Sequence, residues 1–316
     1  MEEIKVPIYL ITGFLESGKT SFLSFTLQQD YFRTEGKTLL ILCEEGEEEY
    51  DEDALAKDNV VIEVIEKEEE FTPERLQALD IIHQPERVVM EYNGMWLVSK
   101  FEEMRLPQGW GIEQHITCVD ASTFQVYMAN MKSLFMDMVR NADMVIFNRC
   151  QEEDPLPSYR RSIKVVNQRA EIIFEDEEGE LGDLFEDEMP FDIDAPVIDI
   201  LPEDYGIWFV DAMDHPDRYV GKTLRFKARA RRPRGMGSKF FIPGRTAMTC
   251  CADDTSFLGY ICKSAYAPKL KPGEWVEVTA KVAFENRSEY QGEGIVLYAE
   301  NVTPCEPLAD EMVYFN

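Results

Sequence analysis

The sequence predicts two domains, an α/β domain with a mostly parallel sheet followed by a small β-barrel. The chain has 316 residues, and a usual domain size of about 100–200 residues makes two domains the natural division. In the first half, β-rich apolar runs alternate with helical patterns, which is typical of a parallel sheet covered on both faces. The last part of the chain instead carries about five strand-like runs with glycine turns, which is typical of a barrel.

Six apolar runs are expected to form the strands of the first domain, and they span residues 4–12, 38–42, 60–64, 87–90, 116–119 and 144–147. A glycine-containing loop follows the first run, and a helical pattern begins at Thr20, so strand, loop and helix occur in that order. Residues 122–143 are expected to form a helix whose apolar stripe packs in the core. This stripe consists of Phe124, Met128, Met131, Leu134, Phe135 and Met138.

Residues 174–204 are dense in acids and contain three prolines, which indicates a domain boundary. We therefore predict a first domain at 1–190, a linker at 191–203 and a second domain at 204–316. The second domain begins with a short helical pattern at 205–219. Five strand-like runs follow at 221–232, 239–254, 257–263, 273–286 and 294–304, and they predict an OB-like barrel.

Charge and composition exclude several classes of protein. The 61 acidic and 32 basic residues give a net charge of -29, which argues against a sequence-blind binder of duplex DNA. The acidic excess either serves solubility or attracts a metal or a basic partner. No apolar run reaches the ~18–20 residues of a membrane span, and the start lacks a secretory signal, so we expect a cytoplasmic protein. Seven cysteines, an odd number, favour reduced thiols or a metal site over a disulfide framework.

The segment GFLESGKT, from Gly13 to Thr20, matches the phosphate-binding pattern G-x-x-x-x-G-K-[ST] between a strand and a helix. Backbone N–H groups around Gly13, Ser17 and Gly18 are expected to wrap the phosphates. Lys19 would neutralise the β- and γ-oxygens, and the Thr20 hydroxyl would reach Mg²⁺. Glu16 is unusual here, because a carboxylate in this cradle weakens nucleotide binding unless it turns outward.

The loop GFLESGKT resembles the GFLGxGKT loop of the CobW-type GTPases, which are relatives of the accessory GTPases that deliver metal to cobalamin synthesis, hydrogenase and urease. Three further segments match in the family's order: Glu91-Tyr92-Asn93-Gly94, CVDASTF with Asp120, and ADMVIFNRC. The resemblance covers about residues 5–190. It implies Mg²⁺-dependent GTP hydrolysis coupled to metal insertion or homeostasis, with Lys19 and Glu91 as catalytic residues. It also implies that Thr20 binds Mg²⁺, that Glu91 supports the Mg²⁺ shell or the attacking water, and that Asn148 contacts the base.

The chain departs from that family at two places. The N-K-x-D motif reads Asn148-Arg149-Cys150-Gln151, so a neutral amide replaces the carboxylate that pairs with guanine, and another purine could be tolerated. The C-x-C-C metal motif is absent, and IEVIEKEEEF stands in that region. The acidic run at 44–53, in which Glu44 and Gly46 align with the family's N-E-F-G segment, is taken as a solvated loop to which we assign no ligands.

The second domain resembles the soluble domain of an uncharacterised bacterial family encoded beside predicted permeases, over about residues 203–307. The adjacent Cys250 and Cys251 point to opposite faces on a strand, and only a bulge or turn would let both bind one metal. With Cys262 and Cys305 they are a candidate transition-metal site, and the alternative is a set of buried structural cysteines.

The segment from Arg225 to Arg231 has a cation at every second position, which places the cations on one face of a strand. That face is either solvated or binds an anion. The anion could be the acidic first domain, a phosphate-bearing ligand or single-stranded nucleic acid.

Two functions follow from these residues. The first is a CobW-type hydrolase of GTP or another purine nucleotide, linked to metal homeostasis or to a permease-like or metalloprotein partner. The second is a degenerate P-loop adaptor that acts through protein contacts, which Glu16 and Gln151 favour.

Overall fold

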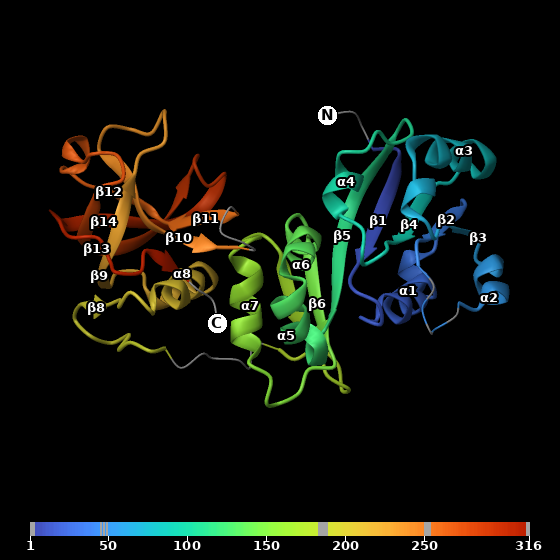
Figure 1. The fold of residues 1–316 in the computed structure, drawn as a ribbon, viewed down its shortest axis with the longest axis horizontal. Coiled ribbons are helices and arrows are strands. Elements are labelled where there is room, and N and C mark those ends of the chain that lie inside the picture. Colours follow the sequence, from blue (N-terminus) through green and yellow to red (C-terminus); the bar gives the residue numbers. More distant parts are fainter. Residues whose placement is uncertain are drawn as a thin grey trace. The chain divides into compact units, whose positions relative to one another are not determined.

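A seven-stranded sheet organises the first half of the chain in the computed structural model (Figure 1). The structure describes residues 4–44, 46, 48, 50–182, 189–249 and 254–313. The strand order is β3-β2-β4-β1-β5-β6-β7, and every pairing is parallel, which confirms the predicted α/β class. The strands are β1 (Val6–Thr12), β2 (Thr38–Leu42), β3 (Val60–Val64), β4 (Arg87–Glu91), β5 (Trp110–Asp120), β6 (Met144–Asn148) and β7 (Glu171–Phe174).

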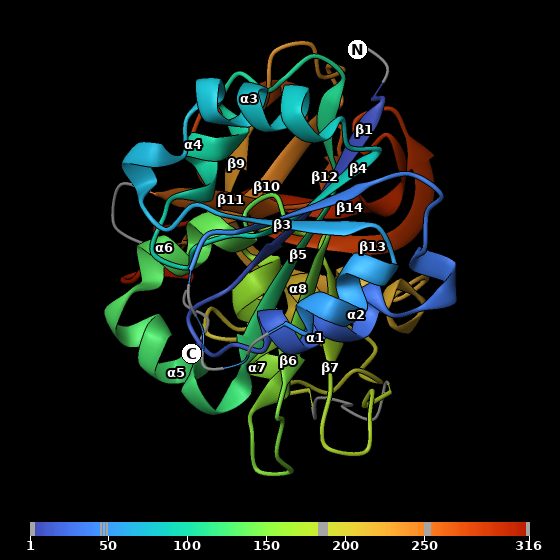
Figure 2. The same cartoon turned by 90° about the vertical axis from the view of Figure 1, so that its right-hand side faces the viewer.

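Helices cover both faces of this sheet, as the alternating pattern predicts. Figure 2 shows α1 and α2 on the opposite side of the strands from α3. Leu23 and Leu27 of α1 and Leu55 of α2 share one buried cluster with strand residues such as Ile11 and Val89. The helices of this half are α1 (Lys19–Leu27), α2 (Glu52–Lys57), α3 (Pro73–His83), α4 (Val98–Glu102), α5 (Ala121–Asn130) and α6 (Lys132–Val139).

The helix expected at 122–143 is two helices, α5 and α6, which meet at Met131. The Asn130 side-chain amide donates to the Val126 carbonyl at 2.8 Å, so it competes with the backbone for that acceptor and disfavours continuation of the helix. Of the predicted apolar stripe, Phe124, Phe135 and Met138 are buried, and the other three residues are half-buried. The break rotates α6 so that Met136, which lies outside the predicted stripe, is buried too.

The second half forms a closed five-stranded barrel, as predicted. Its strands pair around the circle β9-β10-β12-β14-β13, and pairing of β13 with β9 closes it. The elements of this half are β8 (Ile198–Asp199), α8 (Tyr205–Asp214), β9 (Thr223–Arg231), β10 (Phe240–Met248), β11 (Thr255–Gly259), β12 (Ile261–Lys263), β13 (Trp275–Arg287), β14 (Gly292–Pro304) and β15 (Met312–Val313). The core includes the buried aromatic residues Trp208 of α8 and Phe226 of β9.

Two features of the barrel bear on the sequence analysis. The run at 257–263 is divided at Tyr260 into β11 and β12, and the buried Tyr260 hydroxyl donates to the Phe209 carbonyl. Along β9 the expected alternation is present. The buried residues are Leu224, Phe226, Ala228 and Ala230, and the exposed ones are Arg225, Lys227, Arg229 and Arg231.

The chain divides into two compact units that are not continuous in sequence. The first comprises 1–156 and 167–184, and the second comprises 157–166 and 185–316. Most of α7 (Leu156–Lys164) therefore groups with the barrel unit, where Arg160 donates to an Asp214 carboxylate oxygen at 2.8 Å and Val165 enters the core. None of the helices in the described ranges has both the length and the apolar character that crossing a membrane requires.

Candidate nucleotide-binding site

The last residue of each of four neighbouring strands is polar, and these residues lie at the carboxyl edge of the parallel sheet. Thr12 ends β1, Glu91 ends β4, Asp120 ends β5 and Asn148 ends β6. The register places Asp120 directly opposite Asn148. Ligands of open α/β sheets bind in the crevice outside this edge, so the fold directs the four side chains toward one site.

The loop between β1 and α1 needs its two glycines. Gly13 and Gly18 have φ values of +141° and +90°, which favour residues without a Cβ. A Cβ on Gly13 would lie 2.3 Å from the Cys118 carbonyl oxygen, and one on Gly18 would lie 2.7 Å from Asn148 Nδ2. The close packing brings the loop backbone against β5 and β6, so the N-terminus of α1 faces the carboxyl edge.

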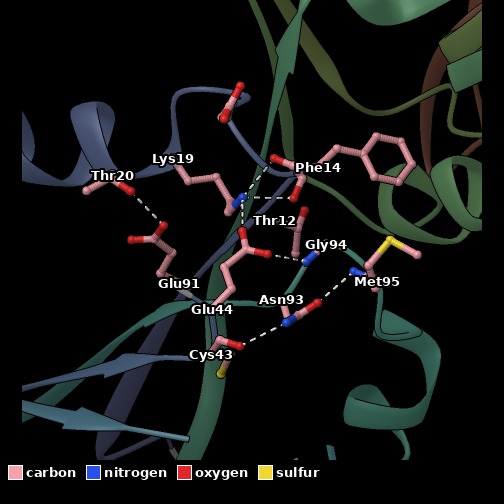
Figure 3. A network of polar contacts seen from close by, with 12 residues as sticks. Thr12, Phe14, Lys19, Thr20, Cys43, Glu44, Glu91, Asn93, Gly94 and Met95 are labelled. Atoms are coloured by element: carbon pink, nitrogen blue, oxygen red, sulfur yellow. Dashed lines mark hydrogen bonds and ion pairs between the residues drawn. The ribbon is translucent and has the colours of Figure 1, made fainter. Parts of the chain in front are cut away.

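Lys19 lies in the centre of this loop and is buried, with 3% of its side chain exposed. Its ammonium donates to the Gly13 carbonyl at 3.0 Å and to the Phe14 carbonyl at 2.8 Å (Figure 3). The same ammonium forms an ion pair with Glu44, whose second carboxylate oxygen accepts the Gly94 N–H at 3.3 Å. Glu44 therefore connects Lys19 to the loop after β4, a contact that the sequence did not predict.

Thr20 and Glu91, the two residues expected beside Mg²⁺, are in direct contact. The Thr20 hydroxyl donates to Glu91 Oε1 at 2.8 Å, and the Tyr50 hydroxyl donates to Oε2. Burial raises the pKa of Glu91, whereas the hydrogen bonds from Tyr50 and Thr20 and the charge of Lys19 lower it. Burial and the Glu91 carboxylate raise the pKa of Tyr50, which keeps its hydroxyl a donor at neutral pH.

The expected base-contacting residues also reach the loop, through its backbone. Asn148 Nδ2 donates to the Ser17 carbonyl at 2.8 Å, and Arg149 Nη1 donates to the Glu16 carbonyl at 2.9 Å. Arg149 also pairs with the Asp120 carboxylate. These contacts connect the ends of β5 and β6 to the loop between β1 and α1, so the two halves of the expected nucleotide site are joined.

Glu16 and Gln151, the two departures from the family pattern, differ in their positions. Glu16 lines the cleft, but its residue is exposed and its φ of +63° is left-handed, a conformation that suits the glycine of the family's loop better. Gln151 is not among the residues that line the cleft. Its side-chain amide donates to the Arg149 carbonyl at 3.4 Å, and its backbone N–H donates to Asp154 at 2.8 Å.

A cleft of about 330 Å³ opens over these groups. Its lining includes Leu15, Glu16, Gly18, Lys19, Thr20, Ser21, Glu44, Gly46, Glu48, Glu91, Asp120 and Arg149. Two buried polar atoms of the loop region, Ser17 Oγ and Asn148 Oδ1, have no hydrogen-bond partner among the described residues. Buried polar atoms are almost always paired, so these two fit a site whose partners come from a bound ligand.

The candidate cysteine site is only partly described. Cys250 and Cys251 lie outside the described residues, and Cys262 is buried on β12, where burial raises the pKa of its thiol to about 12. A protonated core thiol is a poor metal ligand. Within the described ranges, no group of three or more His, Cys, Asp or Glu residues could hold a metal ion.

Sequence reasoning missed three contacts in the site: the Lys19–Glu44 ion pair, the Tyr50–Glu91 hydrogen bond and the pairing of Arg149 with Asp120. Asp120 lies in the motif CVDASTF, and its position directly after an apolar run predicts a place at the carboxyl edge of the sheet. Tyr50 had no signal beyond being an aromatic residue within an acidic run.

Comparisons with known proteins agree with this geometry. The model of the CobW/HypB/UreG nucleotide-binding domain matches residues 7–174, and that of the DUF1980 C-terminal domain matches residues 182–315. The two matches confirm the resemblances stated for the two halves. No curated protein matches the chain.

Three solved structures illustrate the likeness. The Zn(II)-bound YjiA GTPase from E. coli is 17% identical, with 82% of this chain and 89% of that chain covered and a TM-score of 0.43. Hydrogenase maturation factor HypB from Archaeoglobus fulgidus is 18% identical, with 55% and 83% covered and a TM-score of 0.40. HypB from Helicobacter pylori in complex with nickel is 14% identical, with 55% and 80% covered and a TM-score of 0.35.

Proposed function

The chain belongs to the CobW/HypB/UreG nucleotide-binding family, and from this premise we propose that it binds a purine nucleoside triphosphate with Mg²⁺ and hydrolyses it, with GTP as the first candidate. The observation that carries the proposal is the position of Lys19. Its buried ammonium lies in a glycine loop at the start of a helix, where backbone N–H groups and a fixed cation favour phosphate.

Each neighbouring group has a role in this proposal. Lys19 neutralises charge that develops on the terminal phosphate, and the loop backbone orients the phosphate chain. The N–H of Gly94 faces the same position as Lys19, since both contact the Glu44 carboxylate. Ser17 Oγ and Asn148 Oδ1 have unused hydrogen-bonding capacity that a nucleotide can satisfy.

Thr20 and Glu91 would hold Mg²⁺, because a hydroxyl and a carboxylate in contact at a sheet edge are the hard oxygen ligands that this ion prefers. When bound, the ion neutralises phosphate charge. Burial raises the pKa of Glu91, so this carboxylate is also suited to accept a hydrogen bond from an attacking water and orient it.

The experiment that tests the proposal compares Lys19→Ala with Lys67→Ala, an exposed lysine outside the cleft. Titration of fluorescent GTP and ATP, with and without Mg²⁺, measures binding, and phosphate release measures hydrolysis. We expect Lys19→Ala to abolish Mg²⁺-dependent binding with an unchanged circular dichroism spectrum, because the ammonium acts on phosphates. Equal binding by both variants would show that the loop is not a working phosphate site.

A second function is favoured by one observation, the Glu44 carboxylate on Lys19. In an adaptor that acts through protein contacts, this ion pair would stay closed and the loop would be structural. The same titrations separate the two functions. Saturable Mg²⁺-dependent binding followed by phosphate release supports the hydrolase, whereas absence of binding in the wild-type protein supports the adaptor.

A role in metal homeostasis, with a permease-like or metalloprotein partner, is a further part of the proposal. It is supported by the family and by the Cys250-Cys251 pair, which could bind a transition metal as cargo. Elemental analysis of purified wild-type protein and of Cys250→Ser/Cys251→Ser tests it. Loss of bound zinc or nickel in the variant supports the role, and equal metal content in both proteins contradicts a site at these cysteines.

A further inference from the structure

Two adjoining clefts on the barrel unit gather cations from β9 and the loop after it. The first, of about 330 Å³, has a lining that includes Arg229, Arg231, Arg232 and Phe257. The second, of about 310 Å³, has a lining that includes Arg232, Arg234 and Lys271. Because Ala230, Arg232 and Pro272 line both clefts, the two form one continuous surface, which we call the basic cleft.

The charge of the basic cleft is opposite to that of the chain. Its lining contains four arginines and one lysine and no acidic residue, whereas the whole chain has 61 acidic against 32 basic residues. Like charges that line one cleft repel one another, and physiological salt screens this repulsion over about 8 Å. Binding of an anion lowers the repulsion between the cations.

The exposed cations of β9, from Arg225 to Arg231, lie close to acidic residues at the Arg225 end of the strand. Arg225 donates to both carboxylate oxygens of Asp199, at 3.0 and 2.6 Å, and Lys227 stands opposite Glu277 in the sheet register. Both residues lie outside the basic cleft. The cations that line the cleft differ, because among the described residues Arg231 of β9 and Arg234 of the following loop form no ion pair within 4.0 Å.

Backbone carbonyls orient two of the cleft's guanidinium groups. Arg229 Nε donates to the Gly273 carbonyl at 3.2 Å, and Arg232 Nη1 donates to the Ala267 carbonyl at 3.4 Å. The only carboxylate within ion-pair distance of Arg229 in the described structure is that of Glu311, at the limit of 4.0 Å. A guanidinium has five N–H donors, so a single carbonyl contact fixes its direction and leaves donors for phosphate oxygens.

The cleft also contains one aromatic ring. Phe257 of β11 is partly exposed in the first cleft, and the Arg231 guanidinium lies over it, 5.3 Å from the ring centroid. A ring beside phosphate-binding arginines is suited to stacking with a base. The cations extend from Arg229 on β9 to Arg234 in the following loop.

We propose that the basic cleft is a second ligand site, which binds a chain of linked phosphates such as single-stranded nucleic acid or inorganic polyphosphate. An extended row of cations fits several phosphates in series better than one isolated anion. The site lies wholly within the barrel unit and uses none of the nucleotide-site residues. Its test is therefore independent of the proposed hydrolysis.

The experiment measures binding of a fluorescent thymidine 15-mer and of inorganic polyphosphate to the full chain over a range of salt concentrations. The test variant Arg231→Gln/Arg234→Gln removes two cleft cations. The control Lys227→Gln/Lys281→Gln removes two exposed cations outside the cleft, so the net charge of the two variants is equal. We expect the test variant to weaken binding at least about tenfold and to reduce the salt slope by about 1.4, at ~0.7 per lost phosphate contact on a single strand.

A third variant, Phe257→Leu, distinguishes the two sources of phosphate. If it weakens oligonucleotide binding but not polyphosphate binding, the ligand is nucleic acid stacked on the ring. If it affects neither and polyphosphate binds at least as tightly, the ligand is polyphosphate. The proposal is overturned if the wild-type chain binds neither probe at low salt, or if the test and control variants weaken binding equally.

Discussion

Replacing Glu44 by glutamine isolates the effect of one carboxylate on nucleotide binding. The Glu44 carboxylate contacts both the Lys19 ammonium and the Gly94 N–H, the two groups proposed to receive a terminal phosphate. A triphosphate can use them only if the carboxylate leaves. Glutamine keeps the shape and an acceptor for Gly94 but removes the negative charge.

The burial of this pair sets the size of the effect. The side chains of Lys19 and Glu44 are 3% and 10% exposed, so solvent screens their attraction poorly. At an effective dielectric constant of 20, opposite charges about 4 Å apart attract by about 4 kcal/mol before desolvation is subtracted. We take about a third of this attraction as the net free energy that a phosphate must supply to displace Glu44 from Lys19. Glu44→Gln then tightens triphosphate binding by about tenfold. Without nucleotide, the variant should have a free energy of unfolding about 1–3 kcal/mol lower than the wild type, because Lys19 loses its counter-charge.

The assay compares fluorescent GTP and GDP in the presence of Mg²⁺. Because GDP lacks the terminal phosphate, its affinity should change much less than that of GTP. Glu48→Gln is the matched control, since Glu48 lines the same cleft but accepts a hydrogen bond from Ser21 at 2.6 Å instead of pairing with Lys19. Equal gains for GTP and GDP, or an equal gain in the Glu48 control, would refute the reasoning.

Three further predictions follow from single residues. Glu16→Gly should tighten nucleotide binding a few-fold, because it removes a carboxylate from the cleft. It should change the free energy of unfolding in urea by less than about 1 kcal/mol, because relief of the left-handed φ at residue 16 offsets the higher backbone entropy of glycine in the unfolded chain. A large loss of stability would contradict this. Gln151→Asp should raise the ratio of GTP to ATP affinity, since a carboxylate accepts two guanine N–H groups, and an unchanged ratio would mean that other residues read the base. Burial lowers the pKa of His115 from 6.5 to about 4, so between these pH values the imidazole is protonated in the unfolded chain but neutral in the folded one. The free energy of unfolding should therefore fall by up to about 3 kcal/mol as the pH drops from 6.5 to 4. Urea titrations of wild type and His115→Gln over this range measure the loss, and the same loss in both proteins would assign it to other groups.

Six strands of the first sheet were predictable because each contains a short apolar run that is followed by a polar or glycine-containing motif. The runs at 38–42 and 60–64 match β2 and β3 residue for residue. β7 was missed because its four residues, Glu171–Phe174, are too few to show a period beside an acidic segment. The break at Met131 was missed because apolar spacing alone does not report the local competition from Asn130.

In the site, the loop Gly13–Thr20 was predictable because its chemistry is confined to consecutive residues. The partner of Lys19 was not, because the alignment of Glu44 with the family's N-E-F-G segment does not reveal that the chain after β2 brings its carboxylate to the Lys19 ammonium. The same applies to Tyr50, which reaches Glu91 across a separation of 41 residues.

The grouping of α7 with the barrel unit has a consequence for synthesis of the chain. The helix ends at Lys164, whereas the rest of its unit follows residue 184 in the sequence. On the ribosome, α7 therefore emerges long before α8 and the barrel strands, while β7, the edge strand of the first sheet, emerges between them. We expect the parallel sheet to form before the rest of the barrel unit has been synthesised, so a chain truncated before α8 contains α7 without the Asp214 carboxylate with which Arg160 pairs.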